Sequence, residues 1–303
     1  MEALPKKKKT DVGKIVFLTV ILAVPISNFL VFWLYVNFDS ILMAFQYRDG
    51  AAIKWGMNNF TRLWADMTSE YSSFWSAFGN TMTYFLCNLC VTLPVSLLLC
   101  YFFFKKIVGY RFFRFVFYLP SILAASTLVV IFQYMIMPNG YYGEICKIFN
   151  IEPKLLVQNP ETANGTILFY TIMTSFGGNI ILFGGAMNHI DGSILEAAEL
   201  DGCNMPTEMF RIVIPLIWPT LSTLIVFAFV GMLGSSGQIM LFVGSGAEGL
   251  KCNTLSFWIY SQVYYGGEYY YPSAIGLVMT AIGLPIALIV KKLLGNAMDA
   301  VAM

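Results

Sequence analysis

The sequence contains little charge. Only 12% of its 303 residues are Asp, Glu, Lys or Arg, and the formal net charge is +1. A soluble globular domain carries roughly 25% charged residues, so the composition argues against a soluble protein and points to a membrane. No basic segment is long enough to follow the phosphates of a nucleic acid, and nucleic-acid binding is therefore not expected.

Catalytic groups are equally scarce. The chain has a single histidine, His189, and no phosphate-binding loop, GxSxG or HExxH motif. Away from their ends its long apolar stretches contain no Asp or Glu, so they cannot form a proton relay of carboxylates. We expect no catalytic residue, no metal site and no cofactor in this chain. Any uphill transport must then draw its energy from a partner.

Long apolar stretches are abundant instead. The chain is 58% hydrophobic with a mean hydropathy of +0.69, and six stretches reach the roughly 20 residues that cross a bilayer. They are residues 14–37, 76–104, 112–137, 166–187, 216–243 and 273–290. The first is too long for a cleaved signal peptide. The expected fold is an all-α integral membrane protein with six transmembrane helices over residues 14–292, between tails at 1–13 and 293–303.

Basic residues predict the orientation. Twelve Lys and Arg lie on the side that holds both termini and the loops after the second and fourth spans, and six lie on the other side. Cytosolic loops are the richer in Lys and Arg, so both termini and the loop at about 188–215 are predicted to be cytosolic. The loops 38–75, 138–163 and 244–271 are then external.

Six cysteines are present, and their spacing indicates no framework. Cys87, Cys90 and Cys100 lie in the second apolar stretch, where cysteine commonly serves as a small packing residue. A redox or zinc pair would need a second pair or a nearby histidine. Cys146 and Cys252 fall in external loops, and the sequence leaves open whether they form a disulfide.

The loop between the fourth and fifth spans contains the segment EAAELDGCNMPTEMFRIVIPLIWP, residues 196–219. Helix formers run to Gly202, where a helix is expected to stop. Asn204 and Pro206 are typical of a second helix start, and Pro215 and Pro219 bend its continuation into the fifth span. The residues alone leave two interpretations open: a stiff helix pair that receives a push from a cytosolic partner, or an amphipathic loop on the headgroups.

This segment resembles the cytoplasmic EAA loop of membrane subunits in binding-protein-dependent ABC importers. The resemblance rests on Glu196-Ala197-Ala198, Asp201-Gly202 and Ile212-Val213-Ile214-Pro215. In that family the loop forms coupling helices that dock into a cleft of the ATP-hydrolysing subunit. The resemblance implies that the ATPase-coupling residues are Glu196, Ala197, Ala198, Asp201, Gly202 and Pro215.

Further segments resemble the carbohydrate-uptake branch of these importers. They are NNFTRLW (58–64), FRFVFYLPSILAASTLVVIFQYMI (113–136) and QIMLFVGSGAEGLKCNTLSFWIYSQVYY (238–265). The layout is similar to the first of the two unlike permeases. The loop at Gly244-Ser245-Gly246-Ala247 departs from the usual Gly-Gly-Pro, which weakens any finer assignment.

The resemblance implies a permease subunit that moves a sugar or oligosaccharide across a bacterial or archaeal cytoplasmic membrane by alternating access. Its implied partners are a second homologous permease in a heterodimer, two subunits that bind ATP and Mg, and an extracellular or periplasmic solute-binding protein. The alternatives are the same importer with an amino acid, peptide or glycerol-phosphate-like cargo, and a membrane enzyme or scaffold. A phosphate ester would favour a deep Arg or Lys, which the candidate spans lack.

Polar residues inside the apolar stretches are candidates for substrate contact, because each is costly there without a partner. Asn88 and Thr171 belong to this group, and the main candidates are Gln133, Tyr134, Ser175, Asn179, Ser236 and Gln238. The alternative for each is a hydrogen bond between helices. Family sugar contacts lie in the spans that flank the coupling loop, which favours the last four.

Overall fold

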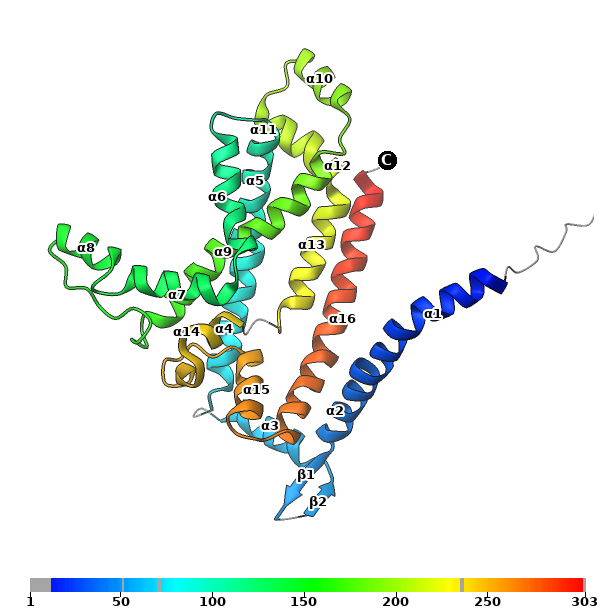
Figure 1. The fold of residues 1–303 in the computed structure, drawn as a ribbon, viewed down its shortest axis with the longest axis vertical. Coiled ribbons are helices and arrows are strands. Elements are labelled where there is room, and N and C mark those ends of the chain that lie inside the picture. Colours follow the sequence, from blue (N-terminus) through cyan, green and yellow to red (C-terminus); the bar gives the residue numbers. More distant parts are fainter. Residues whose placement is uncertain (1–11, 51, 70–71, 235–236, 302–303) are drawn as a thin grey trace, which may run out of the picture.

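The computed structural model describes residues 12–50, 52–69, 72–234 and 237–301. Within them the chain is a bundle of long helices with a small β-hairpin at its lower end (Figure 1). Four helical runs are long and apolar enough to cross a membrane: Val16–Ala44, Phe74–Phe104, Ala163–Met187 and Tyr270–Asn296. Two bent helix pairs raise the number to six among the described residues. Apart from the hairpin, the predicted all-α membrane fold is confirmed.

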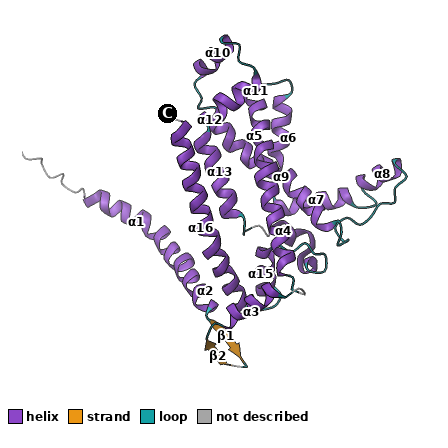
Figure 2. Cartoon of the chain, turned by 180° about the vertical axis from the view of Figure 1, so that it is seen from behind, coloured by secondary structure: helices purple, strands orange, loops and turns teal. Residues whose placement is uncertain are grey.

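The first run stands apart from the bundle. It consists of α1 (Val12–Asn28), a π-helical segment η1 (Phe29–Tyr35) and α2 (Val36–Ala44), and it leans away from the other helices in both views (Figures 1 and 2). The α2 end packs against α16 (Tyr270–Val301). No part of its most apolar window is buried. Such a surface is stable in a lipid bilayer and costly in water.

The centre of the bundle is formed by the second and third runs. The second run joins α4 (Phe74–Cys87), the π-helical segment η2 (Asn88–Thr92) and α5 (Leu93–Phe104) in one helical run. Its α5 part packs against α9 (Ala163–Met187). Their contact is a buried apolar cluster that includes Leu97, Tyr101, Phe183 and Met187.

The prediction of residues 112–137 as a single helical span is wrong. α6 (Tyr110–Ile122) meets the run of α7 (Ala125–Ile136) and α8 (Tyr141–Ile148) at 112°. Pro120 has no N–H to donate in the last turn of α6, and Leu123 and Ala124 have extended backbones. As a result, α7 and α8 form an arm that extends sideways from the bundle (Figure 1).

The prediction of residues 216–243 as one helix is also wrong. The chain bends by 76° between Met205–Leu216 and α13 (Trp218–Gly231), which agrees with the bend expected from the prolines at 215 and 219. α13 then stops, and a separate helix α14 (Gly237–Val243) follows. Glycines lie at positions 231, 234 and 237 around this second break. Glycine destabilises a helix, so these residues favour a break here.

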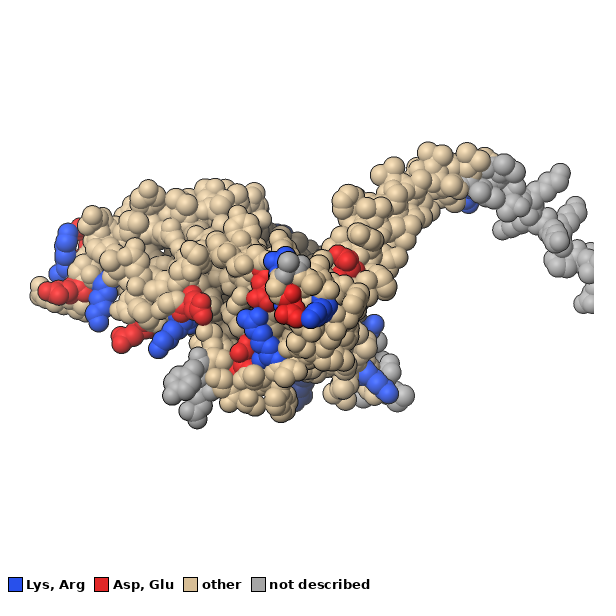
Figure 3. All heavy atoms as spheres, turned by 90° about the horizontal axis from the view of Figure 1, so that it is seen from below, with Lys and Arg blue, Asp and Glu red and all other residues tan. Residues whose placement is uncertain are grey.

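The end of the bundle that is predicted to be external, named the outer end, carries a feature that the all-α prediction omitted. β1 (Gln46–Asp49) and β2 (Ala52–Trp55) form an antiparallel hairpin in which Asp49 pairs with Ala52. Gly50 has a left-handed φ of 63°, and an Asp-Gly pair is a frequent hairpin turn, so the sequence did contain the signal. Seen from this end, acidic and basic side chains are interspersed, and the first helical run bears few of them (Figure 3).

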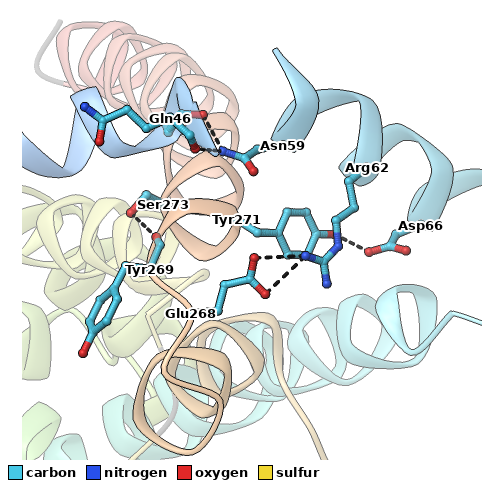
Figure 4. A network of polar contacts seen from close by, with 9 residues as sticks. Gln46, Asn59, Arg62, Asp66, Glu268, Tyr269, Tyr271 and Ser273 are labelled. Atoms are coloured by element: carbon cyan, nitrogen blue, oxygen red, sulfur yellow. Dashed lines mark hydrogen bonds and ion pairs between the residues drawn. The ribbon is translucent and has the colours of Figure 1, made fainter. Parts of the chain in front are cut away.

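A polar network fastens α3 (Asn58–Thr68) to the start of α16 (Figure 4). Arg62 forms an ion pair with Glu268, at 3.0 and 3.2 Å, and its guanidinium lies 4.0 Å from the centre of the Tyr271 ring. The Tyr271 hydroxyl donates to Asp66. On the same helix Asn59 donates to backbone carbonyls of α2 and β1, at 3.0 and 2.7 Å. The outer ends of the first and last spans are thus tied together.

Several of the loops that are predicted for the same side of the membrane lie at the same end of the bundle. The turn after α5, the loop around α10 (Gly192–Leu200) and α11 (Met205–Glu208), and the end of α16 lie at the top of Figure 1. The hairpin, α3 and α15 (Leu255–Tyr264) lie at the bottom. α16 stays helical to Val301, through most of the predicted tail at 293–303.

All six cysteines are free thiols. Cys146 is buried in α8, and Cys252 is buried in the loop between η4 (Gly244–Ala247) and α15. Burial raises the pKa of the Cys252 thiol to about 11, so it stays protonated near neutral pH and reacts poorly. Cys146 and Cys252 are therefore separate thiols in this structure.

Candidate functional site

The loop at 188–215 opens with a capped helix. Asp191 precedes α10, and its carboxylate accepts a hydrogen bond from the Ser193 N–H at 3.0 Å. This bond lowers the pKa of Asp191. A charged cap at this position also complements the positive end of the helix dipole, so the start of α10 follows from local sequence.

α10 ends as predicted just before Gly202, whose φ of 74° is left-handed. The N–H of Gly202 donates to Glu199 O at 3.0 Å, and the N–H of Cys203 donates to Ala198 O at 2.9 Å. These two bonds form a Schellman cap, which turns the chain sharply. Glycine is the residue that adopts this conformation without strain.

A second capped helix follows directly. Asn204 Oδ1 accepts from the Thr207 N–H at 3.0 Å, and Pro206 occupies the first turn of α11. The helical path continues through η3 (Met209–Val213) and α12 (Ile214–Leu216) to the 76° bend. Met209 and Val213 are buried in the α5–α9 cluster. α10 and α11 thus form the predicted helix pair, and the residues that follow α11 pack into the bundle.

The proposed coupling residues lie mostly on the outer surface of this loop. Glu196, Ala197, Asp201 and Gly202 are exposed, Ala198 is buried, and Pro215 is half-buried in α12. Sequence reasoning did not single out Leu200 and Phe210, which are 90% and 64% exposed. The loop protrudes from the bundle (Figure 1), and apolar side chains on such a surface are typical of a site that another protein covers.

A polar cavity of about 220 Å³ lies between the helices of the second run, α9, α13 and α14. Its polar lining residues are Tyr84, Asn88, Thr92, Thr171, Ser175 and Gln238, and none of its described lining residues is charged. Gly231 and Met232 lie on its wall, where α13 ends. The cavity therefore lies at the break in the fifth span.

The predicted substrate residues separate into different places. Ser175 and Gln238 line this cavity. Gln133 lines another one, where its side chain donates to Phe242 O at 3.2 Å, and Tyr134 is 65% exposed. Asn179 is half-buried on α9 but lines neither cavity. Ser236 lies outside the described residues. The cavity brings together two of the six candidates.

The polar groups of the cavity keep hydrogen-bonding capacity. Ser175 Oγ donates to Thr171 O at 2.6 Å and Thr171 Oγ1 donates to Ile167 O at 2.8 Å, so both hydroxyl oxygens remain able to accept. The buried Tyr84 hydroxyl has no hydrogen-bond partner among the described residues. With the aromatic ring of Phe85 beside them, these groups suit a neutral ligand with several hydroxyls.

Sequence reasoning missed Tyr84 and Thr92 as lining residues. Together with Asn88 they recur every four residues along the second run, and this spacing places side chains on one face of a helix. That regular spacing was the available signal. It does not by itself say which face of a wholly apolar span turns toward its neighbours.

Residues 92–299 match the family model described as the inner membrane component of binding-protein-dependent transport systems. The chain is 26% identical over 275 residues to the arabinooligosaccharides transport system permease protein AraP of Bacillus subtilis (strain 168), covering 89% of this chain and 86% of that protein. It is 25% identical to the multiple sugar-binding transport system permease protein MsmF of Streptococcus mutans, with coverage of 86% and 89%.

A crystal structure of a bacterial ABC transporter involved in the import of the acidic polysaccharide alginate contains a chain with the same fold. The TM-score is 0.81 at 21% identity, with coverage of 94% of this chain and 97% of that one. The bent third and fifth spans therefore belong to a known architecture. Because the family model spans more than half of the sequence, this chain belongs to the family of binding-protein-dependent transport system inner membrane components.

Proposed function

We propose that this chain is a permease subunit of an ATP-driven importer that moves a sugar or oligosaccharide across the cytoplasmic membrane by alternating access. The observation that carries the proposal is the cavity between the second run, α9, α13 and α14, whose described lining residues offer hydroxyl and amide groups and no charge. The same helices lead to the protruding loop that holds the EAA residues. The proposed ligand site and the proposed docking site for the partner ATPase thus lie in the same helix bundle.

The chemistry of the cavity supports a carbohydrate cargo. A sugar presents hydroxyl groups for Asn88, Ser175 and Gln238, and aliphatic ring faces for the aromatic side chains of the cavity. A phosphate ester or a charged amino acid would need an opposite charge at this depth, and the described lining residues offer none. The names of the relatives AraP and MsmF, an arabinooligosaccharides and a multiple sugar-binding transport system permease, agree with this choice.

The proposed assembly has four kinds of subunit. A second permease completes the pathway, two ATPase subunits hold ATP and Mg at the coupling loops, and a solute-binding protein delivers the cargo from outside. One of the solved alginate transporter structures contains a periplasmic protein bound to an alginate pentasaccharide. The excess of Lys and Arg at the coupling-loop side supports cytosolic termini by the positive-inside rule.

Affinity purification of the chain from its native membrane, followed by mass spectrometry, tests the assembly. We expect a second six-span subunit and an ATPase with a phosphate-binding loop to copurify. The complex is then placed in vesicles with ATP inside, and uptake of labelled neutral oligosaccharides is measured with the cognate binding protein. Recovery of the chain alone, or uptake that does not depend on ATP, would overturn the proposal.

A further inference from the structure

The coupling loop contains a buried carboxylate outside its EAA residues. Glu208 of α11 is 3% exposed, and its Oε2 lies 2.8 Å from Lys105 Nζ. The Tyr101 hydroxyl lies 3.3 Å from Glu208 Oε1 and 3.1 Å from Met205 O. Lys105 and Tyr101 belong to the end of α5, so this cluster joins the coupling loop to the second run rather than to α9 or α13.

The Glu208–Lys105 pair lies where two helix ends meet. Lys105 is the residue that caps the carbonyl end of α5, and Glu208 lies in the first turn of α11. A cation at a helix C-terminus and an anion at an N-terminus are both favoured by the helix dipoles. Separating the two helices would leave the Glu208 carboxylate buried without its cation, which is strongly unfavourable. α11 and α5 therefore tend to move together.

The same helical run reaches the cavity and the outer end. Tyr84, Asn88 and Thr92 line the cavity, and the π-helical segment η2 spans Asn88–Thr92 at that level. Segments of this kind often occur at functional sites inside helices. Further out, Asn80 Nδ2 donates to Lys251 O at 2.9 Å and to the Asn253 carbonyl at 2.8 Å, which fastens the run to the external loop before α15.

We propose that the Glu208–Lys105 pair is a joint that transmits movement of the coupling loop to the second run. The second run then carries this movement to the cavity that it lines. Glu208, Lys105 and Tyr101 are positioning residues, because they contact neither the cavity nor the exposed surface of α10. This inference rests on the proposed function and adds to it a defined route. It predicts that the pair controls how much cargo moves for each ATP hydrolysed.

The test uses the full complex in vesicles and measures uptake and ATP hydrolysis together. Glu208→Gln keeps the size of the side chain and removes its charge. We expect it to lower the number of cargo molecules imported per ATP by about tenfold, a usual size for the coupling between two sites. The reversed pair Glu208→Lys with Lys105→Glu restores the opposite charges, and we expect it to recover most of the lost coupling.

The exposed neighbour Lys106 provides the matched control, and Lys106→Met should keep the wild-type ratio. A wild-type ratio in Glu208→Gln would overturn the joint. If Glu208→Gln impairs assembly, the reversed pair decides: recovery of uptake per ATP supports the joint, and no recovery overturns it. If wild-type vesicles show no ATP-driven uptake, the proposed importer function itself has failed, which is distinct from both outcomes.

Discussion

The two ends of the bundle each hold an ion pair between segments far apart in the sequence, and the pairs differ in burial. At the outer end the side chains of Arg62 and Glu268 are 49% and 34% exposed. At the coupling-loop end those of Lys105 and Glu208 are 24% and 4% exposed. Exposed pairs contribute little because water and salt screen them, whereas breaking a buried pair leaves a charge without a partner.

The outer end spreads its connections over several contacts. The Arg62 guanidinium also lies over the Tyr271 ring, Asp66 accepts from the Tyr271 hydroxyl, and Asn59 donates to two carbonyls (Figure 4). The coupling-loop end concentrates its polar connection to α5 in the cluster around Glu208. The comparison predicts that substitutions at the outer end are tolerated and that those at the inner joint are not. The variants below are ordered by their expected effect on stability.

Lys105→Met is expected to have the largest effect. It leaves the Glu208 carboxylate almost fully buried, with only the Tyr101 hydroxyl nearby. Breaking a buried pair in this way should lower the free energy of unfolding by about 3 kcal/mol, the low end of the usual range. The measurement is denaturant unfolding of the purified chain in detergent. A loss no greater than that of Lys106→Met would contradict the importance of burial.

Gly202→Leu comes next. The residue has a left-handed φ of 74°, while the space around its missing side chain is open. The strain should therefore come from the backbone and cost about 1–2 kcal/mol, together with a loss of copurifying ATPase. Gly192→Leu is the matched control, because it also faces open space on α10 but has no left-handed φ. Equal losses in both variants would show that backbone strain at residue 202 is unimportant.

Arg62→Met should lower the free energy of unfolding by no more than about 1 kcal/mol, because the pair with Glu268 is exposed. The loss should shrink as salt is added, since salt screens exposed charges. Arg48→Met, at an exposed position of β1, serves as the control for removing a basic residue from this end. A loss as large as that of Lys105→Met would remove the contrast between the two ends.

The same contrast explains how much could be predicted from sequence. The coupling loop follows local rules, because a cap at Asp191, a left-handed Gly202 and a cap at Asn204 each act within a few residues. Its geometry was therefore predictable from the residues alone. The Asp-Gly turn of the hairpin obeys an equally local rule, so the hairpin could also have been predicted from the sequence.

The cavity depends on packing, and there the predictions were weaker. The break after α6 falls at Leu123 and Ala124, whose backbones are extended, although neither residue type is a turn signal. Tyr134 is polar and lies deep in an apolar stretch, yet it faces outward. Periodicity shows which residues share a face, but the neighbour that covers the face is decided by the arrangement of the spans.

Glu196→Lys should have the smallest effect on stability and sharpens the comparison most. Glu196 is exposed on α10 and forms no ion pair among the described residues, so we expect the unfolding free energy to stay within about 0.5 kcal/mol of wild type. Uptake by the assembled complex should nevertheless be lost, because the reversed charge lies on the surface proposed to dock the ATPase. Glu199→Lys makes the same change three residues later on the same helix, outside the EAA residues. If both variants transport equally well, the docking role of Glu196 is wrong. If only Glu196→Lys fails, the exposed face of the loop acts by contact with a partner, which distinguishes it from the buried face that contacts α5.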